Sequence, residues 1–434
     1  MEAEPCPGGI SVTDQTKPAR RFNPFTALGP GLITGAADED PGGIATHSEA
    51  GARFGLDMLW TAFVTYPFMA AFQSICGRIG RVTGRGLAIN MRRIFPRPVV
   101  LGAVALLVLA NTLNIAADIA AMGEAAQLVF GGGRHVYTLG LAGFTLLLQV
   151  FVPYHRYVGF LKWMTVTLFA YVAVAFATHL NWTQVLTRSF LPQIRFDLET
   201  ATVVVAVFGT TISPYLFFWQ TAEEVEDLSI RKDEHPLKFH PEEAEFELKR
   251  IGWDTYVGMA YANGIGFFVM LSTAVTLHAA GITRIDSAAQ AAAALKPLAG
   301  DFAFLLFALG IIATGLLAVP VLAASAAYAL SEAMGWRASL ERRFEEARGF
   351  YGVIGLAILA GVALDWSPMD PMQALFWSAV LNGVIAVPLM VLIMLMSQNR
   401  EIMGRFTATR SQRIVGWAAV AIMAAAAAVM FAQI

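Results

Sequence analysis

Long apolar runs dominate the chain and return at regular intervals along it. A helix needs about 20 apolar residues to cross a bilayer, and runs of this length lie at about 27–54, 57–77, 98–128, 136–154, 157–179, 200–223, 252–280, 300–333, 351–367, 371–397 and 411–433. The pattern predicts an all-α polytopic membrane protein with about 11 transmembrane helices. Residues 1–24 are polar and predict a cytoplasmic N-terminal tail, followed by a single transmembrane domain over 25–433.

Two of these runs are interrupted at their middle. The first contains ADEDPGG at 37–43, and the sixth contains GTTISPY at 209–215. Proline removes a backbone donor and glycine favours unwound backbone, so both helices are expected to break there. Because the breaks are five spans apart, they predict two five-helix units of opposite orientation, about 25–180 and 200–397, with an extra helix at about 411–433. Matched interruptions in two inverted halves indicate a binding site near the bilayer midplane.

Three consecutive carboxylates, Asp38, Glu39 and Asp40, stand in the first break. A charged side chain at bilayer depth costs about 2.5–3.5 kcal/mol on insertion scales, so these three need compensation, which a bound cation would supply. The breaks also free backbone carbonyls and place hydroxyls beside them, which gives a set of oxygen donors: Asp40, Ala37, Thr210, Ser213 and Tyr215. Oxygen donors favour hard ions such as magnesium, calcium and manganese. We therefore expect a cation transporter.

Composition and charge placement support a membrane protein with a defined orientation. The chain is 56% hydrophobic and 14% charged, whereas a soluble chain carries roughly 25% charged residues. With the N-terminus in the cytoplasm, only six of the 30 Lys and Arg lie outside, namely Arg53, Arg134, Arg188, Arg195, Arg284 and Lys296. The positive-inside rule therefore predicts a multi-pass protein of the cell (inner) membrane with its C-terminus outside.

Other classes of function lack support in the sequence. There is no phosphate-cradling loop, zinc-ligand cluster or nucleophile motif, so neither an enzyme nor a cofactor is expected. The basic residues are spread over short loops, which argues against a nucleic-acid partner. The expected partners are a metal-ion substrate and the lipid bilayer. Cys6 and Cys76 lie far apart and imply no disulfide framework.

Several polar segments have more than one interpretation. Asn111, Asn114 and Asp118 share one face of the third span, where they either support the site or act as packing contacts between helices. The segment 224–250 is dense in both signs of charge and contains His235 and His240. It predicts a solvated cytoplasmic connector in preference to a metal-binding loop. The outer connections 181–199 and 282–299 predict short amphipathic helices at the membrane surface.

The sequences GPGLITGAADEDPGG and GTTISPYLFFW resemble the Nramp family of divalent-metal transporters. The resemblance implies a leucine-transporter-like fold, a 5+5 inverted repeat with broken helices 1 and 6. It also implies that Asp40 is the metal-binding carboxylate and that the carbonyls of Ala37 and Thr210 face the ion. Asn382 in the tenth span lies near a polar residue that contacts the metal in the family.

Departures from the family pattern carry information about the ion. Gly43 stands where the family has its ligating asparagine, Ser213 where it has its ligating methionine, and Tyr215 where it has a histidine. A thioether is a soft ligand that helps select manganese, iron and cadmium, so its loss removes that preference. Together with the added charge of Asp38 and Glu39, these changes resemble the Nramp-related magnesium transporters. The expected metal site is Asp40, Ala37, Gly43, Thr210, Ser213, Tyr215, Glu39 and Asn382.

Groups that would relay protons are scarce in comparison with the family. The third span keeps Asp118 but has Ala121 at the family's glutamate position, and the run 351–367 has no arginine. We therefore expect uptake of Mg²⁺ (and Mn²⁺) by alternating access without proton coupling. A membrane potential of 100 mV would drive the entry of a dication with roughly 4.6 kcal/mol. The alternatives are a proton-coupled Mn²⁺/Fe²⁺ transporter and an amino-acid or organic-cation transporter of the same superfamily.

Overall fold

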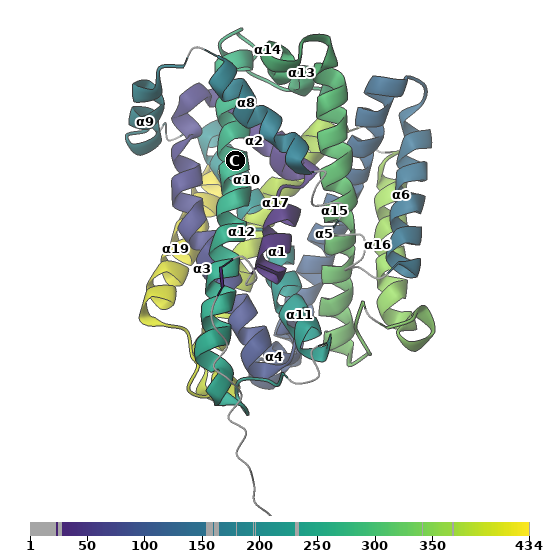
Figure 1. Cartoon of the computed structure of the whole chain (residues 1–434), viewed down its shortest axis with the longest axis vertical. Helices are drawn as coiled ribbons and strands as arrows, with labels where there is room; N and C mark the ends of the chain where they lie inside the picture. Colours follow the sequence, from purple (N-terminus) through teal and green to yellow (C-terminus); the bar gives the residue numbers. More distant parts are fainter. Residues whose placement is uncertain are drawn as a thin grey trace, which may run out of the picture.

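The computed structural model describes residues 23–24, 28–152, 159, 165–178, 180–193, 195, 197–230, 234–340, 342–366 and 369–433. These residues form helices, connecting segments and no strands. Most of the long helices run along the longest axis of the molecule, and Figure 1 shows them side by side. Most of the predicted tail 1–24 and residues 160–164 of the fifth predicted span lie outside the described residues.

Helices lie in nine of the predicted apolar runs; of the fifth run, 157–179, the structure describes only residues 159 and 165–178. These helices are α3 (Trp60–Thr83), α5 (Arg97–Phe130), α6 (Arg134–Phe151), α8 (Phe169–Ala177), α12 (Ala244–Thr273), α15 (Ala303–Met334), α16 (Arg348–Leu364), α17 (Pro371–Gln398) and α19 (Arg410–Ala432). Among the described residues, six helical stretches are long and apolar enough by themselves to cross a bilayer: Arg97–Phe130, Leu198–Ile230, Pro241–His278, Ala288–Met334, Pro371–Gln398 and Arg410–Ala432. One of these six stretches, Leu198–Ile230, contains the break of the sixth predicted span.

The first predicted span is broken at the acidic stretch. α1 (Pro30–Asp38) ends at Asp38, and α2 (Pro41–Phe54) begins with proline in its first turn. Asp40 is the N-cap of α2, and its Oδ1 accepts a hydrogen bond of 2.6 Å from the Gly43 amide. Proline and an aspartate cap are both typical of a helix start. The sequence therefore ends one helix and starts the next within three residues.

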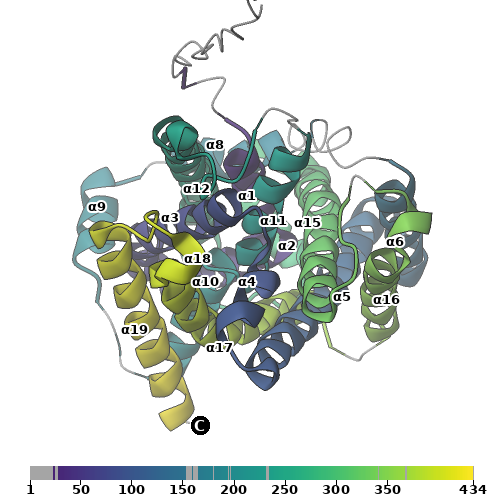
Figure 2. The ribbon, with the colours of Figure 1, turned by 90° about the horizontal axis from the view of Figure 1, so that it is seen from below.

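The sixth predicted span is broken in the same way. α10 (Leu198–Thr211) ends before Ile212, and α11 (Pro214–Ile230) starts at the proline. α10 packs against α17 and α2, while α1 packs against α12 and α11. Figure 2, seen along the long axis, shows α1, α2, α10 and α11 in the interior of the bundle.

Close contacts between glycines fix α1 against α12. A Cβ atom at Gly35 would lie 2.1 Å from the Gly258 carbonyl oxygen, and one at Gly31 would lie 2.7 Å from the Thr255 nitrogen. The N-terminus of α1 is held by Asp254 of α12, whose carboxylate accepts hydrogen bonds from the amides of Gly29, Gly31 and Leu32 at 2.7–3.0 Å. One buried carboxylate therefore caps a helix that is more than 220 residues away in sequence.

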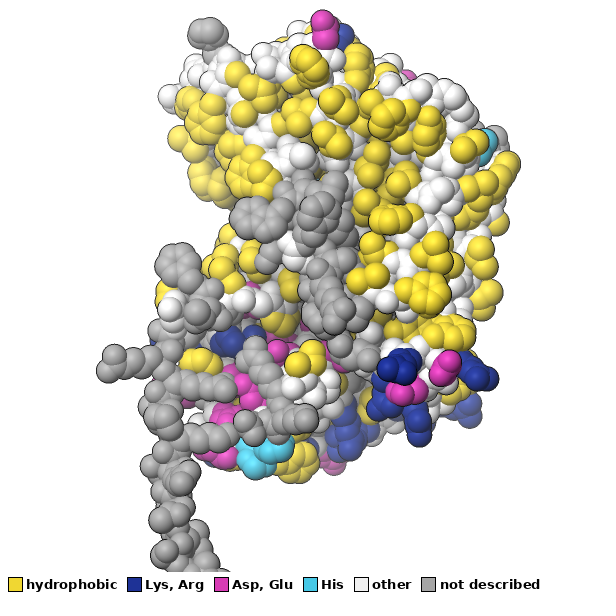
Figure 3. All heavy atoms as spheres, turned by 45° about the vertical axis from the view of Figure 1, so that its right-hand side comes forward, with side chains coloured by type: hydrophobic (Ala, Val, Ile, Leu, Met, Phe, Trp, Pro, Cys, Tyr) yellow, Lys and Arg dark blue, Asp and Glu magenta, His cyan; other side chains and the backbone are white. Residues whose placement is uncertain are grey.

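Short helices cover both ends of the long ones. α13 (Ala288–Ala292), α14 (Lys296–Ala299) and α9 (Trp182–Phe190) lie near the top of Figure 1, while α4 (Leu87–Ile94) and α18 (Arg400–Met403) lie at the opposite end. The predicted short helices in the connections 181–199 and 282–299 are thus present. The face in Figure 3 carries a broad apolar band, with the charged side chains gathered mainly at its lower end. Exposed Phe144, Leu147 and Leu356 belong to such a surface, as expected where a helix faces lipid.

The prediction of a solvated connector over 224–250 is wrong for many of its charged side chains, because they are buried. Arg81 of α3 is fully buried and contacts Asp227, Glu234 and Glu247, and Arg250 contacts Glu224 at 2.6 Å and Glu247 at 2.8 Å. A dense run of both charges looks solvated in sequence, but here its members compensate one another inside the protein. His235 and His240 lie 4.5 Å apart between ring centroids. Among the described residues, no three His, Cys, Asp or Glu side chains are placed to hold a metal ion by themselves.

Candidate metal site

The acidic break is buried in the middle of the helices. Asp38, Glu39 and Asp40 have exposed fractions of 4%, 2% and 5%. Asp38 Oδ1 and Glu39 Oε2 have no hydrogen-bond partner. Buried carboxylates that lack partners are costly and require a compensating charge or ligand. The break therefore holds carboxyl oxygen atoms without hydrogen-bond partners, as expected of a site for a cation.

Three oxygen atoms surround the position that a side chain would take at Gly43. A Cβ atom at Gly43 would have as its nearest neighbours the Asp38 carbonyl oxygen at 3.5 Å, Asp40 Oδ1 at 3.5 Å and Thr210 Oγ1 at 3.6 Å. These three atoms come from both broken helices, so the two breaks meet beside Gly43. The arrangement supplies a carbonyl, a carboxylate and a hydroxyl without a side chain at position 43, which suits a hard cation.

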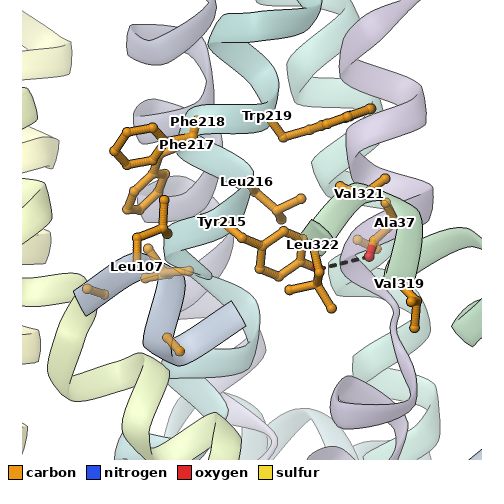
Figure 4. Packing of buried hydrophobic residues seen from close by; sticks show 14 of the residues in the cluster. Ala37, Leu107, Tyr215, Leu216, Phe217, Phe218, Trp219, Val319, Val321 and Leu322 are labelled. Carbon is orange, nitrogen blue, oxygen red and sulfur yellow. Dashed lines mark hydrogen bonds between the residues drawn. The ribbon is translucent and has the colours of Figure 1, made fainter. Parts of the chain in front are cut away.

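Tyr215 joins the two breaks directly. Its hydroxyl donates a hydrogen bond of 2.9 Å to the Ala37 carbonyl, and Figure 4 shows the ring extended toward α1. The Tyr215 carbonyl in turn accepts from the Ser325 hydroxyl at 2.9 Å, and Asn111 donates to Ser325 Oγ and to the Leu322 carbonyl. The carbonyl that the first break frees at Ala37 thus has a partner from the second break.

Ser213 and Thr210 are also close neighbours. The Ser213 hydroxyl lies 2.5 Å from the Thr210 carbonyl oxygen and 3.0 Å from that of Gly209, so it bonds within its own break. Asn382 is 4% exposed on α17, and its neighbour Gly383 lies against Gly209, where a Cβ would approach the Gly383 nitrogen to 2.3 Å. Asn382 is therefore buried on a helix that touches the second break.

Glu39 faces a different side of the break. Its carboxylate lies near the backbone of Gly266 on α12, whereas Asp40 lies beside Gly43 and Thr210. The eight residues of the expected site thus all lie at or beside the two breaks, but they do not all face one point.

Asp118 is a neighbour of the site that the expected set lacks. It is 1% exposed on α5, and its carboxylate lies near the Gly42 backbone and the charge of Asp40. Asp118 Oδ2 and Asn114 Nδ2 have no partner. In the sequence, the spacing that puts Asn111, Asn114 and Asp118 on one helix face is the feature that indicates a polar neighbour of the site. The structure assigns Asn111 to helix packing and places Asp118 next to the first break.

Comparison with known proteins identifies the family. The model of the family "Natural resistance-associated macrophage protein-like" (Nramp) matches residues 31–433. The chain belongs to the Nramp family. Curated relatives include the divalent metal cation transporter MntH of Klebsiella pneumoniae, 26% identical over 424 residues and 95% of each chain. That of Verminephrobacter eiseniae is 29% identical over 365 residues and 80% of each chain.

Solved structures show the fold of this Nramp-family chain. A manganese transporter of Eremococcus coleocola aligns with a TM-score of 0.73 at 16% identity, covering 99% of this chain and 89% of that one. Mhp1, a nucleobase-cation-symport-1 family transporter, aligns with a TM-score of 0.57 at 13% identity, covering 94% and 92%. The predicted fold class, an all-α polytopic membrane protein of the leucine-transporter type, is confirmed.

Proposed function

We propose that this Nramp-family protein transports divalent metal cations, with Mg²⁺ and Mn²⁺ as substrates, through the oxygen-lined space beside Gly43. The observation that carries the proposal is the meeting of Asp40 Oδ1, the Asp38 carbonyl and Thr210 Oγ1 around a position without a side chain. These are hard oxygen donors, and no methionine stands at position 213 to favour softer ions. The relatives named divalent metal cation transporters support the class of substrate.

The proposed metal set is Asp40, Ala37, Gly43, Thr210, Ser213, Tyr215, Glu39 and Asn382. Within it, Asp40 supplies the formal charge nearest Gly43, and Thr210 supplies the nearest side-chain oxygen of the second break. Tyr215 and Ser213 hold the freed carbonyls of Ala37 and Thr210 in place. Magnesium gives up its waters reluctantly, and Gly43 places no side chain among the three oxygen atoms that would compete with water for the ion.

Transport without proton coupling is part of the same proposal. Ala121 and Tyr215 stand where the family has a glutamate and a histidine, so Asp118, which lies near Asp40, lacks those two groups for a proton relay. We place the N-terminus in the cytoplasm and the C-terminus outside, on the distribution of Lys and Arg. The two five-helix units and the terminal helix α19 form one transmembrane domain in this proposal.

Uptake into proteoliposomes tests the function. Vesicles containing a metal-sensitive dye and the purified protein should report entry of external Mg²⁺ and Mn²⁺, accelerated by an inside-negative potential. Gly43→Asn places an amide in the oxygen-lined space, and we expect it to slow Mg²⁺ uptake more than Mn²⁺ uptake. Uptake of an amino acid or organic cation with no metal flux would refute the proposal. The same loss of both ions in Gly43→Asn would refute the role of the open space in selectivity.

A further inference from the structure

Two short helices close opposite ends of the molecule. α4 (Leu87–Ile94), between α3 and α5, is the inner lid, and α13 (Ala288–Ala292), between α12 and α15, is the outer lid. A helix N-terminus leaves backbone amides that need acceptors. The N-cap of α4 is Gly86, which has no side chain to accept them. The acceptor must come from elsewhere in the fold.

Glu332, near the end of α15, supplies that acceptor for the inner lid. Its Oε2 accepts hydrogen bonds from the amides of Ala88 at 3.1 Å and Ile89 at 3.4 Å, and the residue is 8% exposed. Gly86 makes the approach possible, because a Cβ there would lie 1.7 Å from Glu332 Oε1. The inner lid also packs against α11 and α17. Glu332 therefore fixes the lid over the cytoplasmic half of the second broken span.

Glu124, near the end of α5, supplies one acceptor for the outer lid, in addition to the Ser287 side chain that caps α13 by accepting from the Gln290 amide. Its Oε1 accepts a hydrogen bond of 2.9 Å from the Ala288 amide, the first residue of α13. Three residues earlier, the Ile285 amide donates to Glu49 Oε2 of α2 at 2.9 Å. Thr283, Arg284 and Ile285 line a cavity of about 480 Å³ together with Glu49. The segment that leads into the outer lid thus lies over the outer half of the first broken span.

The two anchors occupy matching places in the inverted repeat. α5 corresponds to the third predicted span. α15 corresponds to the eighth, which is the third span of the second unit. The lids match as well, because α4 precedes α5 and α13 precedes α15, and each lid is anchored by the third-span helix of the other unit. We infer that Glu124 and Glu332 are paired positioning residues that hold the outer and the inner lid, and that the balance between them sets which end of the protein opens.

Both lids are held in this structure, and Asp40 is 5% exposed. Loss of one carboxylate releases one lid and leaves the other bound. Glu124→Ala therefore favours opening to the outside, and Glu332→Ala favours opening to the cytoplasm. Opposite effects of two substitutions of the same type distinguish this role from a general loss of stability.

Labelling of single cysteines tests the inference without reference to the transported ion. In a Cys6→Ser, Cys76→Ala background, Ala45→Cys reports the outer cavity and Ala222→Cys reports α11 beneath the inner lid. Both positions are buried, at 2% and 3% exposure. A membrane-impermeant maleimide should label Ala45→Cys about tenfold faster in Glu124→Ala, the change that corresponds to about 1.4 kcal/mol. Ala222→Cys, probed from the cytoplasmic side, should respond in the same way to Glu332→Ala.

Three comparisons decide the outcome. Glu124→Gln and Glu332→Gln keep an acceptor oxygen, so their labelling should stay near that of the parent. The double variant Glu124→Ala/Glu332→Ala should be less biased toward either side than each single variant. Labelling that rises at both reporters in each single variant, or that changes at neither, would overturn the inference. If an alanine variant does not fold, Glu→Asp shortens the same side chain, and its effects must carry the same opposite signs.

Discussion

Asp40 has one structural role, as the N-cap of α2, and one proposed role, in holding the ion, and a single substitution can separate them. Its Oδ1 caps α2 by accepting from the Gly43 amide at 2.6 Å, and its negative charge faces the oxygen-lined space. Asparagine is as good an N-cap as aspartate, whereas alanine at an N-cap costs about 0.5–2 kcal/mol. Asp40→Asn therefore keeps the helix start and removes the charge. Asp40→Ala removes both.

The two variants should differ in stability but agree in transport. A charge at bilayer depth costs about 2.5–3.5 kcal/mol, so Asp40→Asn in the absence of metal should be at least as stable as the parent. Asp40→Ala should be about 1 kcal/mol less stable than Asp40→Asn, because alanine cannot cap α2. Uptake of Mn²⁺ and Mg²⁺ should fall to background in both variants, since the ion loses the carboxylate nearest Gly43.

Thermal unfolding in detergent and uptake into proteoliposomes measure the two effects separately. Asp197→Asn is the matched control, because Asp197 caps α10 by accepting from the Thr200 amide at 2.8 Å, at the opposite end of that helix from Thr210. It should change neither stability nor uptake. Substantial uptake by Asp40→Asn would refute the assignment of the ion to this space. A lower stability of Asp40→Asn than of Asp40→Ala would refute the capping argument.

Four further outcomes follow from the same contacts. Ser213→Met should improve uptake of Mn²⁺ and Cd²⁺ relative to Mg²⁺, and unchanged ratios would contradict the argument from ligand softness. A pH-sensitive dye inside the vesicles should report no acidification during Mg²⁺ uptake, whereas matched proton entry would contradict uncoupled transport. Gly35→Ala should destabilise the protein by about 1–3 kcal/mol through overpacking against Gly258, while Gly264→Ala, with open space beside it, should not. Arg81→Ala should cost about 3–5 kcal/mol by leaving buried carboxylates unpaired, against about 0–1 kcal/mol for Arg342→Ala in an exposed pair with Glu346.

The two helix breaks were predictable because their causes are local. Pro41 and Pro214 cannot continue the helix before them, and Asp40 is a typical cap, so the sequence alone places both interruptions. The identity of the site's oxygen donors follows from the same short segments. Which atoms meet depends on packing between distant helices, and the approach of Asp40 and Thr210 to Gly43 from two different helix breaks has no local signature.

Contacts between side chains and distant backbone were the features that sequence patterns missed. Asp254 caps α1, and Glu332 caps α4, across more than 220 residues in each case. A carboxylate that accepts from a remote amide leaves no periodic or spacing signal. The prediction for the charged segment 224–250 failed for a related reason. A charged run shows which charges are present, but it does not show whether they pair inside the protein, as they do around Arg81.

The three departures from the family pattern act together in the structure. The Ser213 hydroxyl donates a hydrogen bond to the Thr210 carbonyl, and the Tyr215 hydroxyl donates one to the Ala37 carbonyl. The side chains at the family's methionine and histidine positions therefore bond to the carbonyls that the breaks free. The third departure, Gly43, then leaves the space beside Asp40 Oδ1 and Thr210 Oγ1 open. Ser213→Met would add a soft ligand and also release the Thr210 carbonyl, whereas Gly43→Asn would fill the space and leave both carbonyls bonded. In the proposed site, charge and the absence of a side chain at position 43 should therefore weigh more than ligand softness in determining which cation is accepted.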